Sequence, residues 1–115
     1  MVLGKSGEDM AVRYLRRKRY RILARNFRSK LGEIDIVAQH VRTLVFCEVK
    51  LRLNEAFGQP FEAVTPHKQR RIRKVAELYM AIAVNPGEFD AVRFDVISIL
   101  ADGASFNINH IENAF

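Results

Sequence analysis

Charged side chains inside two strand-like apolar runs are the feature that most constrains how this chain folds. The runs cover residues 32–38 (GEIDIVA) and 44–52 (LVFCEVKLR). Short runs rich in β-branched residues, separated by a polar turn, predict two neighbouring strands. Because side chains alternate along a strand, Glu33 and Asp35 share one face, and Glu48 and Lys50 share one face of the next strand. Buried charge is costly unless it is paired or bound to a cation, so a common face would form an ion-pair cluster or a cation site.

The rest of the pattern predicts one α/β domain over residues 1–115, with a mixed central sheet flanked by helices in the order α-β-β-β-α-β-β. Helical spacing predicts helices over 6–18 and 66–83. Ser6 is expected to cap the first, with Glu8 and Asp9 in its first turn, and Thr65 to cap the second ahead of Pro66. Strands are expected at 19–28, 33–38, 43–51, 92–100 and 104–111, and loops at 53–60 and 84–90. The nearly continuous apolar content of the second and third strands predicts burial on both faces.

Basic residues dominate the charge of the chain. The formal net charge is +6 and the pI is about 9.9, which favours an anionic partner, most simply nucleic acid. A solvated basic face is the alternative for any one of these residues. No base-reading motif is present, so shape and phosphate contacts are expected rather than sequence specificity. The candidate nucleic-acid-binding residues are Arg13, Arg16, Arg17, Arg28, Lys30, Arg52, Lys68, Arg70, Arg71 and Lys74.

The single cysteine, Cys47, lies in an apolar run and allows no disulfide within the chain. A small buried hydrophobe is the simplest role for it, and a reduced, cytoplasmic setting is expected. No apolar stretch is long enough to span a bilayer and the first residues do not form a signal peptide, so no membrane partner is expected.

The acids of the two strands suit a divalent metal. Mg²⁺ prefers hard oxygen ligands from one or two carboxylates and keeps several waters, so Asp35, Glu48 and the carbonyl of Val49 are candidate ligands of Mg²⁺ or Mn²⁺. Lys50 beside the metal can position a water or stabilise charge on an attacked phosphate, which suits phosphodiester hydrolysis. An acid followed by E-x-K is a short pattern, however, and a structural ion pair between Lys50 and Glu48 explains it equally well. Glu8 alone is explained as a first-turn acid that complements the helix dipole.

Several motifs spread over nearly the whole chain carry a family resemblance. They are Gly4-x-x-Gly7-Glu8, Asn26-Phe27-Arg28, Gly32-Glu33-Ile34-Asp35-Ile36-Val37, Phe46-Cys47-Glu48-Val49-Lys50-Leu51-Arg52, Gly58 with Ala63-Val64 and Lys68, Arg93-Phe94-Asp95-Val96, and the ending His110-Ile111-Glu112-Asn113-Ala114-Phe115. On these motifs the chain resembles the YraN-like bacterial family of small uncharacterised proteins. Cys47 stands where Val is usual and Leu51 where Thr is common.

That family is similar to the PD-(D/E)xK nuclease superfamily, which has the restriction-endonuclease-like fold, and to archaeal Holliday junction resolvases. The resemblance implies Asp35 and Glu48 as metal-binding acids, Lys50 as the catalytic lysine, and Glu8 as a helical acid near the metal, acting directly or through water. It gives Glu33 no settled counterpart, so Glu33 is either a group that supports the metal ligands or an additional acid. It makes Arg52 a phosphate contact.

The activity implied is a metal-dependent endonuclease acting on DNA, including branched DNA, and a homodimer is expected by analogy. A protein that binds nucleic acid without cutting it is the alternative. An RNA-directed or partner-bound accessory protein is a third, weaker hypothesis.

Overall fold

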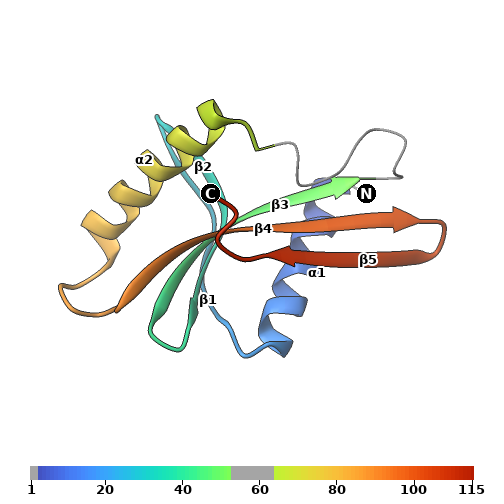
Figure 1. Cartoon of the computed structure of the whole chain (residues 1–115), viewed down its shortest axis with the longest axis horizontal. Coiled ribbons are helices and arrows are strands. Elements are labelled where there is room, and N and C mark those ends of the chain that lie inside the picture. Colours follow the sequence, from blue (N-terminus) through green and yellow to red (C-terminus); the bar gives the residue numbers. More distant parts are fainter. Residues whose placement is uncertain (1–2, 53–63) are drawn as a thin grey trace.

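The computed structural model describes residues 3–52 and 64–115 of the chain (Figure 1). The elements in chain order are α1 (Leu3–Arg17), β1 (Arg21–Ser29), β2 (Gly32–His40), β3 (Thr43–Arg52), α2 (Pro66–Ala83), β4 (Ala91–Asp102) and β5 (Ser105–Ile111). The α/β class, the element order and the mixed sheet flanked by helices are therefore confirmed. The loop expected at 53–60 lies outside the described residues.

The five strands form one sheet in the order β1-β2-β3-β4-β5. The β1–β2, β2–β3 and β4–β5 pairs are antiparallel, whereas β3 and β4 are parallel. Parallel neighbours need a crossover connection, and α2 lies on the path from β3 to β4. In the β2–β3 pair Ile36 lies opposite Cys47, and this register fixes which side chains of the two strands meet.

The two helices cover opposite faces of the sheet (Figure 1). One core packs α1, through Ala11, Val12 and Leu15, against one face of the sheet. The other packs α2, through Ile72, Val75, Ala76 and Tyr79, against the other face, where it meets Phe46. The central strands are buried on both sides, as their apolar content predicted.

The first helix begins earlier than expected. It starts at Leu3, so Ser6 lies inside the helix rather than at its cap, and the first turn contains no acidic residue. The prediction that Glu8 and Asp9 complement the helix dipole in the first turn is therefore wrong. The helix also ends sooner, because Arg19 adopts a left-handed backbone (φ 69°) and the N–H of Tyr20 donates to the carbonyl of Leu15. That ending delays β1 to Arg21.

The start of α2 matches its sequence signature. Thr65 is the N-cap with an extended backbone, its side chain accepts a hydrogen bond from the N–H of Lys68, and Pro66 occupies the first helical turn. Neither helix is long and apolar enough to cross a membrane within the part of the chain that is described.

Candidate metal and phosphate site

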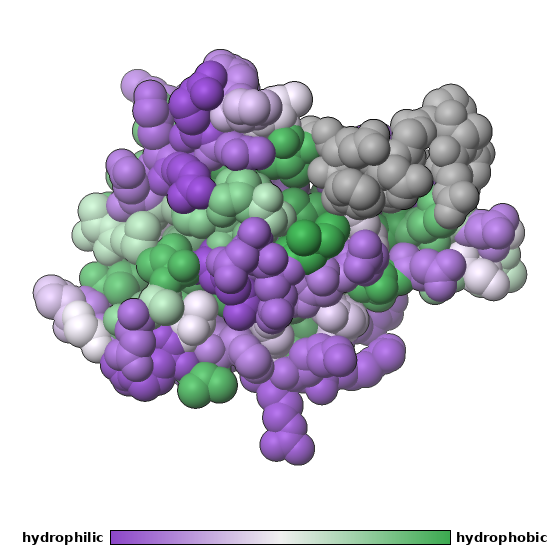
Figure 2. Space-filling model, in the orientation of Figure 1, coloured by the Kyte–Doolittle hydropathy of each residue, from purple (hydrophilic) through white to green (hydrophobic). Residues whose placement is uncertain are grey.

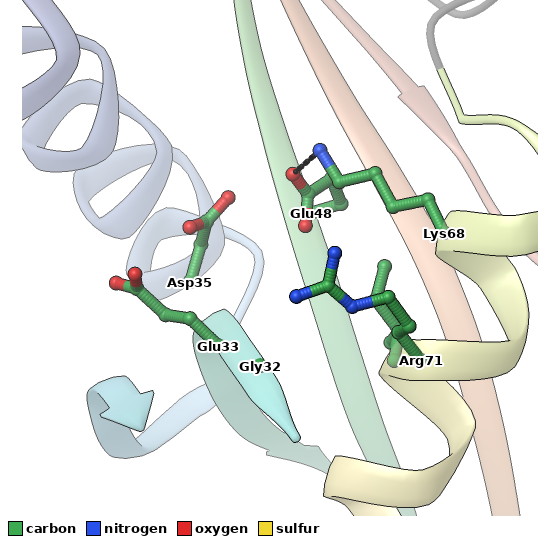
Figure 3. A pocket seen from close by; sticks show the side chains of 7 residues that line it. Gly32, Glu33, Asp35, Glu48, Lys68 and Arg71 are labelled. Atoms are coloured by element: carbon green, nitrogen blue, oxygen red, sulfur yellow. Dashed lines mark ion pairs between the residues drawn. The ribbon is translucent and has the colours of Figure 1, made fainter. Parts of the chain in front are cut away.

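Asp35 and Glu48 face the same pocket. Continuing the register of Ile36 opposite Cys47 by one residue sets Asp35 beside Glu48. Both side chains line a pocket of about 440 Å³ between the sheet and α2, and Figure 3 shows their carboxylates turned toward the same space. Had the two carboxylates pointed to opposite faces of the sheet, a shared metal would have been impossible. The structure satisfies this requirement.

The environment of Asp35 disfavours its charged form. Burial and the neighbouring charge of Glu48 raise its pKa to about 7, with smaller contributions from Glu8 and Glu33. The N–H of Val49 donates to Oδ2 of Asp35 over 2.8 Å and partly opposes this shift. Glu48, Glu8 and Glu33 therefore all act to raise the pKa of Asp35, and the hydrogen bond from the N–H of Val49 acts to lower it.

Glu48 is buried, and two lysines contact it. Its Oε1 lies 2.8 Å from Nζ of Lys68 and 3.4 Å from Nζ of Lys50. Burial and the neighbouring Lys68 lower the pKa of Lys50, although Glu48 opposes that shift. Burial acts to lower the pKa of Lys68 as well, but the hydrogen bonds to Glu48 and Lys50 and the charges of Glu48 and Asp35 together raise it, so the net shift is upward. The sequence predicted Lys50 beside Glu48, whereas Lys68 had been expected only among the basic residues for nucleic acid.

Glu8 reaches this region from α1 but is held by β1. Its Oε1 accepts a hydrogen bond from Nδ2 of Asn26 over 2.8 Å and lies 3.5 Å from Nε of Arg25. It influences the pKa of Asp35. Among the described residues, however, it does not form with Asp35 and Glu48 a group of three ligand atoms close enough to share one ion. Direct coordination by all three acids is therefore absent from this arrangement.

The remaining wall of the pocket combines Glu33 with two cations of α2. Lys68 and Arg71 project from the first turns of the helix toward the acids (Figure 3). The Nε of Arg71 donates to the carbonyl of Leu31 over 3.4 Å, which leaves the two terminal nitrogens of the guanidinium directed to the pocket. Glu33 is exposed and lies 3.6 Å from Arg28.

The ten candidate nucleic-acid residues do not form one surface. Arg13, Arg16 and Arg17 lie on α1, whereas Lys68, Arg70, Arg71 and Lys74 lie on α2, on the other side of the sheet. Figure 2 shows hydrophilic residues gathered over the first half of α2. Lys30 and Arg28 are exposed beside the β1–β2 turn.

Arg52 differs from the other candidate cations. It is half-buried at the end of β3, and its Nε is buried without a hydrogen-bond partner in the described structure. Its expected role as a phosphate contact stays a prediction, as does the metal-binding carbonyl of Val49.

The donor set around the pocket fits a hard divalent cation. With the described residues, Asp35 forms its hydrogen bond through Oδ2 and Glu48 forms its ion pairs through Oε1, so one oxygen of each carboxylate is left for a cation. Two carboxylates and several waters are a common Mg²⁺ environment. A cation between them would also remove the repulsion that raises the pKa of Asp35.

A second polar cluster, on the α1 side of the sheet, was not predicted. Asp95 is fully buried in β4, and its carboxylate accepts two-pronged hydrogen bonds from Arg93, one from His110 and one from the N–H of Asn113. Asp95, His110 and Glu112 bring ligand atoms within 4.8 Å of one another. Arg93, however, already neutralises both carboxylates, at 2.9 Å from Asp95 and 3.2 Å from Glu112. In the sequence, Arg93-Phe94-Asp95-Val96 and the ending that contains His110 and Glu112 were noted only as family motifs, and neither motif by itself predicts that these residues meet.

Comparison with known families agrees with the sequence motifs. The model of the uncharacterised protein family UPF0102 matches residues 7–99. The chain belongs to this family. It is 47% identical to a UPF0102 protein of Syntrophomonas wolfei over 98% of this chain and 96% of that protein. A UPF0102 protein of Geobacter metallireducens is 52% identical over 98% of this chain and 91% of its own length. One from Geotalea daltonii is 53% identical over 98% and 88%.

Membership in UPF0102 confirms the YraN-like resemblance of the motifs. The names of the family and of these relatives specify no reaction, substrate or cofactor. An activity for this chain therefore has to be argued from the chemistry of its own pocket.

Proposed function

We propose that the pocket between β2, β3 and α2 hydrolyses phosphodiester bonds of nucleic acid, DNA in the first place, with Mg²⁺ or Mn²⁺. The observation that carries this proposal is the meeting of Asp35 and Glu48 in one pocket whose opposite wall presents Lys68 and Arg71. Acids on one side and cations on the other match a metal and a phosphate placed side by side.

The residues in and around the pocket have different proposed roles. Asp35 and Glu48 hold the metal, and when bound the metal lowers the pKa of a water and neutralises charge on the phosphate. Lys50, with its lowered pKa, orients the attacking water or takes its proton. Arg71, with terminal nitrogens directed to the pocket, holds the phosphate in position. Glu8 does not contact the metal directly, and it positions β1 through its contacts with Asn26 and Arg25.

The test is cleavage of linear and branched DNA with Mg²⁺ and with Mn²⁺. Asp35→Asn and Lys50→Ala are each expected to lower the cleavage rate by at least about a hundredfold, because each removes a group that acts in the reaction. DNA binding measured in EDTA should change by less than about threefold in both variants. Asp90→Asn, a substitution of an exposed acid at a distance from the pocket, is the matched control and should cleave normally.

A second function is favoured by one specific observation. Glu48 is already paired with two lysines, which neutralise its charge without a metal ion. Such a cluster suits a purely structural group of ion pairs. In that case the protein binds nucleic acid without cutting it. Absence of cleavage of every substrate with both metals, together with salt-sensitive binding, would establish this alternative and reject the nuclease.

A further inference from the structure

Two adjoining pockets lie on the other side of the sheet, against α1. One, of about 370 Å³, is lined by Met10, Arg13, Tyr14, Arg17 and Ile108. The other, of about 300 Å³, is lined by Tyr14, Lys18, Tyr20, His40, His110 and Glu112. Tyr14 lines both pockets, so they are neighbours beside α1 and β5, and we name the two together the α1 trough.

The rim of the α1 trough is basic on one side. Arg13 and Arg17 are one helical turn apart and line the first pocket, and Lys18 lines the second. All three are exposed, and the ammonium of Lys18 lies 5.9 Å from the centre of the Tyr14 ring. Arg16 is equally exposed on the same helix but lines neither pocket. The cations therefore border a defined hollow rather than only a solvated helix face.

The lining of the second pocket is largely aromatic. The rings of Tyr20 and His40 are stacked, with centroids 4.2 Å apart. The hydroxyl of Tyr14 is 3.1 Å from Nδ1 of His110, whose Nε2 is 2.7 Å from Asp95. The carboxylate of Asp95 can only accept, so Nε2 donates to it, and Nδ1 has the hydroxyl of Tyr14 as its partner. This chain fixes the orientation of the Tyr14 ring, so it lies preformed in the wall of the trough.

We propose that the α1 trough binds a single-stranded segment of nucleic acid. Cations that follow a backbone, beside fixed aromatic rings, are the two elements of single-strand binding surfaces. Arg13, Arg17 and Lys18 contact phosphates, and a base enters the hollow beside Tyr14. The carboxylate of Glu112, which is 57% exposed, is placed to accept hydrogen bonds from the amino group of that base.

Single-stranded rather than double-stranded nucleic acid fits the shape of the trough. The bases of a duplex are stacked and paired, so they cannot enter a hollow that is lined by Tyr14, His40 and His110. A duplex would contact the exposed arginines through phosphates alone, and Arg16 would then contribute as much as Arg17.

This inference is independent of the proposed nuclease. The trough contains neither Asp35 nor Glu48, and it is separated from them by the sheet. Its test is made in EDTA, where metal-dependent cleavage does not occur, so its failure and that of the nuclease can be distinguished.

The experiment measures binding of a fluorescent single-stranded DNA oligonucleotide by anisotropy at low salt. Arg17→Glu is expected to weaken binding by at least about tenfold, whereas Arg16→Glu, with the same change of charge on the same helix, weakens it by less than about threefold. Tyr14→Ala should also weaken binding by about tenfold, and Tyr14→Phe should retain most of it because the ring is kept. Thermal unfolding of each variant checks that the fold is intact.

A second measurement does not depend on any variant. Oligonucleotides that carry 5-iodouracil are expected to crosslink on irradiation to Tyr14 or His40 in the wild-type chain, as located by mass spectrometry. Equal losses for Arg16→Glu and Arg17→Glu would overturn the proposal. So would crosslinks confined to α2, or tighter binding of a duplex of equal length than of the single strand.

Discussion

Asp35 has a protonation state that depends on its neighbours in space. Its carboxyl group is in a strand that an isolated peptide would expose to water, yet burial and the approach of Glu48 raise its pKa to about 7. Asp95 shows the opposite balance. Burial alone would raise its pKa, but the hydrogen bonds from His110, Arg93 and the N–H of Asn113, together with the charge of Arg93, hold the pKa below its ordinary value. The two aspartates therefore contribute to stability with opposite dependence on pH.

Asp35→Asn is expected to stabilise the protein at pH 8. Because the folded pKa of Asp35 exceeds its unfolded value near 4, the folded state binds more protons, and stability falls as the pH rises from about 4 to 7. The amide removes this loss and still accepts from Val49, so the free energy of unfolding at pH 8 should rise by about 1–3 kcal/mol. Urea unfolding at pH 5 and pH 8 measures the difference. Asp102→Asn, at an exposed position, is the control substitution.

Asp95→Asn is expected to destabilise the protein by about 3–5 kcal/mol at pH 7, because it leaves Arg93 without its buried partner. The stability that ionised Asp95 contributes is present above its unfolded pKa near 4 and is lost as the pH falls through the lower folded pKa. The gap between wild type and variant in urea unfolding should therefore narrow below about pH 4. Asp90→Asn, which removes an exposed pair with Arg42, should cost less than about 1 kcal/mol. A cost of the same size for both variants would contradict the assignment.

At the scale of the element, α2 shows how a helix start supports the pocket. Thr65 caps the helix through the N–H of Lys68, and the same Lys68 pairs with Glu48. Cations crowd the first half of α2, where they oppose the helix dipole. In the structure this conflict is partly relieved at Lys68 by the buried carboxylate of β3.

Thr65→Ala is expected to lower the free energy of unfolding by about 1 kcal/mol, because the N–H of Lys68 loses its acceptor. Thr65→Ser keeps the oxygen and should cost only a few tenths of a kcal/mol. Urea unfolding compares the two. Equal effects would show that the hydroxyl does not contribute as a cap.

The elements were largely predictable because their signals are local. The apolar runs rich in β-branched residues at 33–38 and 43–51 predicted strands, and the Thr65-Pro66 start predicted a helix, within a few residues of their observed bounds. The predicted beginning of α1 was wrong. A serine followed by acids is only a statistical signal of a helix cap, and it did not show that the helix already begins at Leu3.

At the scale of the whole molecule, the sheet separates the two surfaces for which functions are proposed. The acid pocket lies on the α2 side and the α1 trough on the α1 side, each with its own cations. Basic residues therefore lie on both faces of the sheet. Substitutions in the pocket should alter cleavage and those in the trough should alter binding, because the two sets share no described contact.

The sequence by itself determined the order of the elements. It also gave the hypothesis that Asp35 meets Glu48 with Lys50 beside them, since the alternation of side chains along a strand is a local property. Only the tertiary structure decided that Lys68 joins Glu48, that Glu8 is held by β1, and that Asp95, His110 and Tyr14 form a chain of hydrogen bonds. Those contacts join residues far apart in the chain. They depend on strand register and on the face of the sheet that each helix covers, which no short pattern in the sequence specifies.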